Sequence, residues 1–131
     1  MDLGLKGRRA AVAAGSAGLG LGSAIALAND GAEVVICGRN EHKLSEAVSR
    51  IGHGARYVVC DVSDATGGAA FVEQAESLLG GVDILVCNAG GPPGGTFAST
   101  PVDAYERALD LSLLSVVGMC KAAIPAMQAR K

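Results

Sequence analysis

The sequence has few aromatic side chains and no excess of positive charge. Its 131 residues include no tryptophan, two phenylalanines and two tyrosines. The core must therefore be built from Ala, Val, Leu and Ile, whose small side chains favour close packing of helices on a sheet. Eleven basic and thirteen acidic residues give a formal net charge of −2. Because an extended positive surface is lacking, nucleic acid is not an expected partner.

Long apolar runs and paired cysteines are also lacking. The longest apolar stretch, residues 111–120, is about half the length that crosses a bilayer, so no membrane contact is expected. The apolar run behind the basic N-terminal residues is too short for a signal peptide. Four widely spaced cysteines without a C-x-x-C pair indicate buried structural thiols in a reducing compartment. We therefore expect a cytoplasmic protein without a zinc site or a disulfide framework.

Short β-branched runs alternate with longer helical patterns along the chain. Strands are expected at Arg9–Ala14, Glu33–Cys37, Ala55–Cys60 and Val82–Cys87, and helices at Leu19–Asp30, from Asn40 to Arg50, and at Asp64–Leu79 and Val102–Gln128. This order predicts an α/β fold in one domain, residues 1–131, with a doubly wound parallel sheet covered by helices on both faces. The second and third strands are expected to be buried. Ligands of such sheets bind outside the carboxyl ends of the strands.

The glycine-rich stretch between the first strand and the first helix is the feature around which the chain is organised. Gly18, Gly20 and Gly22 lie at the start of an alanine-rich helix. Glycine lets the backbone approach an anion closely, and free N–H groups at a helix start present partial positive charge to it. The stretch predicts a phosphate-binding turn, although a ligand-free connection between strand and helix could have the same spacing.

Polar side chains follow the next three strands. Arg39 comes about twenty residues after the glycine turn, where a dinucleotide's ribose is recognised, and Gly38 occupies the place of the carboxylate that NAD-binding versions usually carry. A guanidinium there favours a 2′-phosphate. Asp61 and Asn88 follow the third and fourth strands and reach the same crevice. The alternatives are a solvated Arg39, a helix cap at Asp61 and a turn at Asn88.

Together these segments resemble the short-chain dehydrogenase/reductase family over essentially the whole chain. Residues 13–20 are similar to the family's Thr-Gly-x-x-x-Gly-Ile/Leu-Gly, and residues 37–40 to the end of the second strand in its NADP-preferring members. Residues 60–62 resemble the Asp-Val on the adenine side, and residues 87–90 resemble Asn-Asn-Ala-Gly. The resemblance implies a Rossmann-like sheet with strand order 3-2-1-4, which in complete members continues to further strands.

The resemblance also implies a dinucleotide site, with NADP(H) preferred over NAD(H). The residues expected to hold the cofactor are Ala14, Ser16, Ala17, Gly18, Leu19, Gly20, Arg39, Asn40, Asp61, Val62, Asn88, Ala89 and Gly90.

Five positions depart from the family pattern. Ala13 and Ala14 replace Thr-Gly, which adds a methyl group where the backbone normally approaches the cofactor, and Ala17 stands where NADP-binding members often carry Arg or Lys. Cys87 replaces the first Asn of its motif. Ser112 stands in the place of the family's catalytic Asn, with a shorter reach. Cofactor affinity is therefore expected to be weak.

The family's other catalytic residues, a Ser and a Tyr-x-x-x-Lys, would lie on a fifth strand and the helix after it. Tyr57 and Tyr105 are followed four residues later by Asp61 and Leu109, so neither matches the motif. No catalytic residue is therefore assigned, and we expect a truncated oxidoreductase domain that lacks turnover on a carbonyl or alcohol substrate. The alternative is a non-enzymatic dinucleotide-binding or protein-interaction remnant. Surfaces that complete members bury would be uncovered, so we expect a homo-oligomer.

Overall fold

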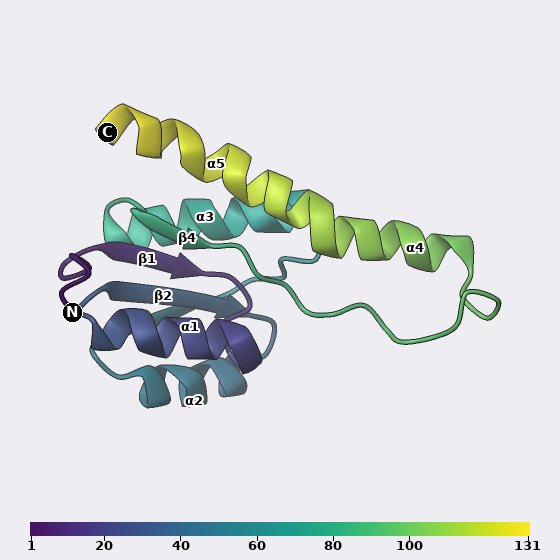
Figure 1. The fold of residues 1–131 in the computed structure, drawn as a ribbon, viewed down its shortest axis with the longest axis horizontal. Helices are drawn as coiled ribbons and strands as arrows, with labels where there is room; N and C mark the ends of the chain where they lie inside the picture. The colour runs from purple at the N-terminus through teal and green to yellow at the C-terminus, as the bar shows by residue number, and fades with distance from the viewer.

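In the computed structural model, which describes residues 1–131, strands and helices alternate as expected (Figure 1). The elements are β1 (Arg9–Val12), α1 (Gly18–Asn29), β2 (Glu33–Gly38), α2 (Glu41–Ile51), β3 (Arg56–Val59), α3 (Ala65–Leu79), β4 (Ile84–Val86), α4 (Val102–Leu109), the π-helical turn η1 (Asp110–Leu114) and α5 (Ser115–Arg130).

The four strands form one parallel sheet in the order β3-β2-β1-β4, which confirms the predicted order. In the register of the sheet, Ala11 of the central strand β1 lies between Val35 of β2 and Leu85 of β4. Ala10, Ala11, Val12 and Ala13 are all completely buried. Small side chains at the centre of the sheet therefore allow helices to pack closely on both of its faces.

Two apolar clusters lie on opposite faces of the sheet. Ala10 and Val12 belong to the cluster beneath α1 and α2, whereas Ala11 and Ala13 belong to the cluster beneath α3 and α5. Figure 1 shows these two helical layers on either side of the strands. The alternation follows from the two-residue period of a strand. Phe71 is the only aromatic side chain in the core, so aliphatic packing dominates it.

The C-terminal helix differs from the single α-helix that its periodicity predicts. It runs from Val102 to Arg130, but residues 110–114 form the π-helical turn η1. There the hydroxyl of the buried Ser115 donates to the carbonyl of Leu111 at 2.6 Å. Beyond this turn Gly118 lies so close to α3 that a Cβ atom would overlap the backbone of Ala65. The π turn thus directly precedes the part of the helix that packs on α3.

The outer strands are more exposed than expected. The third strand was expected to be buried, which is wrong: Val59 of β3 is 52% exposed, and no residue of β3 is fully buried. β3 lies at the edge of the sheet, where one side has no neighbouring strand. β4 forms the other edge, and its three residues are half-buried. β1 also ends two residues earlier than predicted, because the backbone turns at Ala14 with φ +48°.

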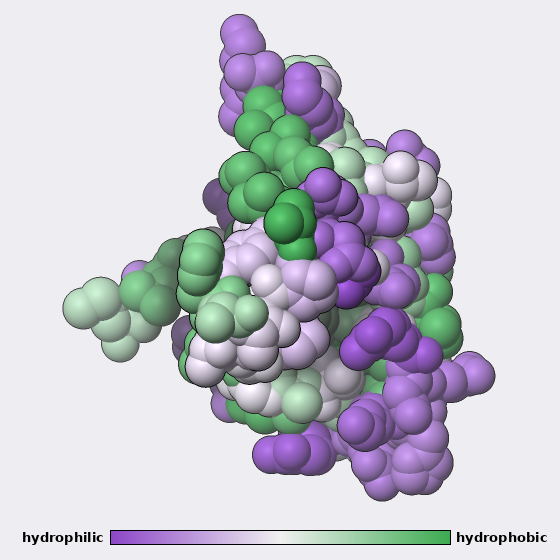
Figure 2. Space-filling view, turned by 90° about the vertical axis from the view of Figure 1, so that its right-hand side faces the viewer, coloured by the Kyte–Doolittle hydropathy of each residue, from purple (hydrophilic) through white to green (hydrophobic).

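The long C-terminal helix leaves many apolar side chains exposed. We call these residues the α4–α5 stripe: Leu109, Leu113, Leu114, Val117 and Ile124. Figure 2 shows a band of apolar surface in the upper part of the molecule, at the height of α4 and α5 in Figure 1. By length and composition alone, Val102–Arg130 is apolar enough to cross a membrane. In this fold its inner side packs on α3 instead, with Met119 and Ala123 completely buried.

Candidate cofactor-binding site

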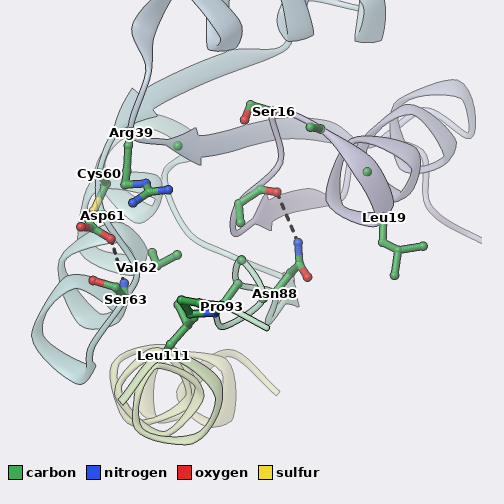
Figure 3. Close-up of a pocket in the computed structure, with 17 residues that line it drawn as sticks. Ser16, Leu19, Arg39, Cys60, Asp61, Val62, Ser63, Asn88, Pro93 and Leu111 are labelled. Carbon is green, nitrogen blue, oxygen red and sulfur yellow. Dashed lines mark hydrogen bonds between the residues drawn. The ribbon is translucent and has the colours of Figure 1, made fainter. Parts of the chain in front are cut away.

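A cleft of about 690 Å³ opens at the carboxyl ends of the strands (Figure 3). Its size is typical of small-molecule sites. Every strand is followed by a segment that contributes to it, and η1 closes one side. The lining residues are Ala14, Ser16, Ala17, Gly18, Leu19, Gly38, Arg39, Cys60, Asp61, Val62, Ser63, Asn88, Ala89, Gly90, Gly91, Pro93 and Leu111.

The N-terminus of α1 faces this cleft without a side-chain cap. Its N-cap residue is Ala17, which makes no side-chain hydrogen bond. α2 and α3 begin differently: Asn40 accepts from the N–H of Lys43 at 3.0 Å, and Asp64 accepts from the N–H of Gly67 at 2.7 Å. The first N–H groups of α1 are therefore open to an anion in the cleft, where the helix dipole favours negative charge.

The glycine turn is held against β2 and β4 by hydrogen bonds. Gly15 donates its N–H to the carbonyl of Cys37 at 3.0 Å, and Asn88 donates from Nδ2 to the carbonyl of Ala14 at 3.3 Å. A Cβ atom on Gly20 would overlap this same carbonyl and the Asn88 amide. Asn88 and Gly20 thus fix the position of the turn between them. The alternative for Asn88 was a role within a local turn, but its side chain contacts the distant residue Ala14 instead.

Arg39 and Asp61 lie on the same side of the cleft, whereas Leu19 and Asn88 lie on the other (Figure 3). The Arg39 guanidinium makes no hydrogen bond or ion pair within residues 1–131, so it is free to meet an anion. Gly38 lies against Ser16 and Leu44, where a Cβ atom would come within 3.2 Å of Leu44. Asp61 accepts from the N–H of Ser63 at 3.0 Å, and α3 is capped by Asp64 instead. The cap alternative for Asp61 is therefore wrong.

The thiols near the cleft are held in their protonated form. Burial raises the pKa of Cys37 to about 12, although the backbone N–H of Ala14 acts in the opposite direction. Burial also raises the pKa of Cys60, whose thiol donates to the carbonyl of Gly67 at 3.4 Å. The thiolate is the form of cysteine that acts as a nucleophile or binds a metal. Residues 1–131 also contain no group of three or more His, Cys, Asp or Glu side chains that could hold a metal ion. The cleft therefore suits reversible binding rather than thiol chemistry.

Ser112 and the two tyrosines lie outside the cleft. Ser112 is exposed on η1, and its neighbour Leu111 lines the cleft instead. Tyr57 donates to a carboxylate oxygen of Glu41 at 3.1 Å, which raises its pKa. Tyr105 stacks edge-on against Phe97, with ring centroids 6.4 Å apart. Neither tyrosine lines the cleft.

The structure brings all but two of the expected cofactor residues together around the cleft. Gly20 is buried behind the turn, and Asn40 caps α2, so these two lie outside the lining. Sequence reasoning left six lining residues out of the site: Gly38, Cys60, Ser63, Gly91, Pro93 and Leu111. Four of them are sequence neighbours of expected residues, which was the available signal. No sequence signal pointed to Pro93 or Leu111, because a loop brings Pro93 to the cleft and the π turn brings Leu111 there.

A parallel sheet of order 3-2-1-4 with a glycine turn and a cleft at its carboxyl edge defines a Rossmann-like fold. The comparison with known proteins agrees. The family model described as short chain dehydrogenase matches residues 8–131, so the chain belongs to the short-chain dehydrogenase/reductase family.

Individual relatives are similar over nearly the whole chain. "Dehydrogenase/reductase SDR family member 4" of Oryctolagus cuniculus is 35% identical over 130 residues, which cover 96% of this chain and 50% of that protein. L-Sorbose reductase from Gluconobacter frateurii, solved with NADPH and L-sorbose, has a TM-score of 0.90 at 32% identity, covering 99% of this chain and 51% of the other. A 3-oxoacyl (acyl-carrier-protein) reductase of Agrobacterium tumefaciens C58 with NADP bound has a TM-score of 0.88 at 34% identity, covering 96% and 50%. The chain thus spans about half the length of these proteins.

Proposed function

We propose that this chain is the NADP(H)-binding part of an oxidoreductase of the short-chain dehydrogenase/reductase type. The observation that carries the proposal is the pairing, in one cleft, of the uncapped N-terminus of α1 with the unpartnered guanidinium of Arg39. The pyrophosphate would lie at the helix start, and Arg39 would bind the 2′-phosphate. Asp61 and Val62 line the adenine side, and Asn88, Ala89 and Gly90 line the side toward the nicotinamide.

The preference for NADP(H) over NAD(H) rests on charge. No carboxylate stands at position 38, and packing against Ser16 and Leu44 leaves little room for one. A charge-assisted contact to the 2′-phosphate contributes roughly 1.5–3 kcal/mol, which corresponds to about tenfold discrimination or more.

The test is calorimetric titration of NADP⁺ and NAD⁺ into the wild type and Arg39→Ala. We expect the wild type to bind NADP⁺ at least about tenfold more tightly and Arg39→Ala to lose this preference. Arg50→Ala, which removes an exposed arginine from the last turn of α2, is the matched control and should keep it. Equal affinities in the wild type, or an unchanged preference in Arg39→Ala, would refute the assignment.

In a complete enzyme of this type, hydride moves between the nicotinamide and a small carbonyl or alcohol substrate. Residues 1–131 form an incomplete domain in this proposal, because they hold neither the family's Ser nor its Tyr-x-x-x-Lys. General acid–base catalysis contributes about 10²–10⁴-fold to such reactions. We therefore expect no oxidation of NADPH by residues 1–131 with ketones or quinones, and no rescue by Ser112→Asn. Turnover that disappears in a Gly18/Gly20 double variant would contradict this.

A second candidate is a non-enzymatic dinucleotide-binding or protein-interaction role. The α4–α5 stripe and the open edge of β4 favour it, because contiguous apolar surface and unpaired strand edges are typical of interfaces. On either reading we propose a cytoplasmic homo-oligomer that uses neither nucleic acid nor a membrane as a partner. Sedimentation over a broad concentration range tests the association, and a monomer throughout would contradict it.

A further inference from the structure

Two cysteine side chains meet between the sheet and the C-terminal helix. Cys87 directly follows β4, and Cys120 lies on α5, 33 residues further along the chain. Their sulfur atoms are 3.9 Å apart, which is the distance of a thiol–thiol contact. Both side chains are half-buried, and Cys87 packs against the apolar cluster beneath α3 and α5. The other two cysteines differ, because Cys37 is completely buried and the thiol of Cys60 donates to the carbonyl of Gly67.

We propose that Cys87 and Cys120 are a redox-active dithiol that closes to a disulfide when the protein meets hydrogen peroxide. A disulfide needs its sulfur atoms about 2.05 Å apart. Rotation about χ1 moves each sulfur about its Cα–Cβ bond, and we expect this rotation to bring the two sulfurs from 3.9 Å to bonding distance without a large backbone movement. The bond would join the carboxyl end of β4 to α5.

Peroxide can reach the pair from the outer side of α5. Cys120 lines a shallow surface groove whose other residues are Val116, Val117, Lys121, Ile124 and Pro125. The sulfur of one cysteine attacks a peroxide oxygen, the O–O bond breaks, and the released hydroxide takes up the thiol proton as water, which leaves a sulfenic acid. The second sulfur then attacks the sulfenic sulfur, so that the S–S bond forms and the S–O bond breaks. The hydroxide that leaves takes up the proton of the second thiol and becomes a second water. The two sulfurs together lose two electrons, and peroxide gains them.

The environment of the pair sets the pH dependence of this reaction. Burial and the contact with Cys120 raise the pKa of Cys87 to about 11. Only a small fraction of thiolate is therefore present at neutral pH, and the rate should rise about tenfold per pH unit below the pKa. Lys121 is the charged side chain that shares the groove with Cys120, and the remaining groove residues do not ionise. The dithiol is thus a slow sensor, selective through geometry rather than through thiolate reactivity.

The bond would strengthen one of the two edges of the sheet. β4 contributes three half-buried residues and no strand lies beyond it. A crosslink across 33 residues restricts the unfolded chain, so oxidation should raise the midpoint of urea unfolding. It would also fix the residue next to Asn88, whose amide holds the glycine turn.

The experiment treats residues 1–131 at low protein concentration with hydrogen peroxide, then alkylates the free thiols and maps the peptides without reduction. We expect an intact mass lower by two hydrogens, one peptide pair joined through Cys87 and Cys120, and reversal by dithiothreitol. Cys87→Ser and Cys120→Ser should each abolish the disulfide. Cys60→Ser is the matched control, and its rate of disulfide formation should stay within about twofold of the wild type.

The peptide map of the wild type decides the question even where a variant fails to fold. A disulfide between other cysteines, a bond between two chains, or sulfinic acid on single cysteines without a crosslink would overturn the proposal. Oxidation in concentrated guanidinium is the reference for an unfolded chain, and there the pairing should be scrambled. The same pairing in both conditions would also contradict a selectivity based on the fold.

Discussion

The central strand β1 lies between β2 and β4. We call the two halves of the sheet on either side of β1 the β2 side and the β4 side, and they differ in burial. On the β2 side Val34, Val35, Ile36 and Cys37 are all buried, and the following helix α2 is capped by Asn40. On the β4 side the strand has three half-buried residues, and α4 buries none of its side chains.

The two sides of the sheet contribute different residues to the same cleft. The β2 side presents Arg39 to the cleft directly after a buried strand, which suits positioning of the adenosine end of a dinucleotide. The β4 side presents Asn88 to Gly91 to the cleft from the end of an edge strand. We therefore propose that the β2 side supplies most of the binding energy for a dinucleotide.

The largest expected effect comes from the contact that joins the two sides. Gly20→Ala would place a Cβ atom on the Ala14 carbonyl and the Asn88 amide, and neither can move without displacing the turn. We expect the free energy of unfolding to fall by about 3 kcal/mol and NADP(H) binding to be lost. Gly22→Ala in the same helix is the control. Its Cβ atom would meet nothing within 4 Å, so about 0.5–1 kcal/mol of stabilisation is expected. Urea unfolding measures both, and equal effects would contradict the close approach.

The next effect concerns the amino end of the β4 side, where Asp83 is tied to β1. Its carboxylate accepts from Nε and Nη2 of Arg9 at 2.9 Å, and Arg130 of α5 lies 4.0 Å away. Arg9 holds the pKa of Asp83 well below its usual range. A depressed pKa contributes stability above the unfolded-state value, and this contribution is lost as the pH falls through the acidic range. Asp83→Asn should therefore cost about 2 kcal/mol at neutral pH and flatten the loss of stability below about pH 4.

Asp103→Asn is the control for that variant. Its partner is Arg107, and both side chains are more than 60% exposed, at 63% and 69%. Exposed pairs contribute about 0–1 kcal/mol, so little change is expected. Unfolding curves at several pH values compare the two variants. A wild type and an Asp83→Asn variant with the same acid dependence would show that the ion pair does not hold the β4 side.

A smaller effect is expected on self-association. Val117→Lys and Ile124→Lys place charges on the α4–α5 stripe and should weaken association about tenfold each in sedimentation experiments. Leu78→Lys is the matched control, because Leu78 is exposed to a similar extent on α3, outside the stripe. An unchanged association constant in the stripe variants, or an equal loss in the control, would show that the stripe is not the interface.

The smallest effect tests backbone strain in the turn. Ala14 adopts φ +48°, a left-handed conformation that costs a residue with a Cβ atom roughly 1–2 kcal/mol. Ala14→Gly should relieve this strain, and the greater freedom of the unfolded chain leaves a net gain of about 0.5–1 kcal/mol. Ala13→Gly, one residue earlier and without a positive φ, should destabilise. Thermal unfolding distinguishes the two, and a destabilised Ala14→Gly would rule out the strain.

The predictable parts of this molecule are those with local causes. Strand order, the cap at Asn40 and the gathering of Arg39 with Asp61 and Asn88 follow from periodicity, capping chemistry and the shared edge of a parallel sheet. These features depend on residues close in sequence, together with a topology that the family resemblance supplies.

The remaining features depend on packing between distant segments. The π turn at 110–114 lies just before the place where α5 approaches Gly68 of α3, and no periodicity in the helix reveals it. Ala14 adopts a left-handed conformation, which is normally found at glycine, so an alanine at this position gives no sign of it in the sequence. The contact between Cys87 and Cys120 joins elements 33 residues apart, and only the packing of α5 determines it.

The most direct test of the division between the two sides is a pair of calorimetric titrations, with NADPH and with adenosine 2′,5′-bisphosphate, which carries the 2′-phosphate but no nicotinamide. If the β2 side supplies the binding energy, the two ligands should bind residues 1–131 with dissociation constants within about tenfold of each other. NADPH binding more than about 100-fold more tightly would place the main contacts at the nicotinamide end. A complete absence of binding by both ligands would contradict the cofactor site itself.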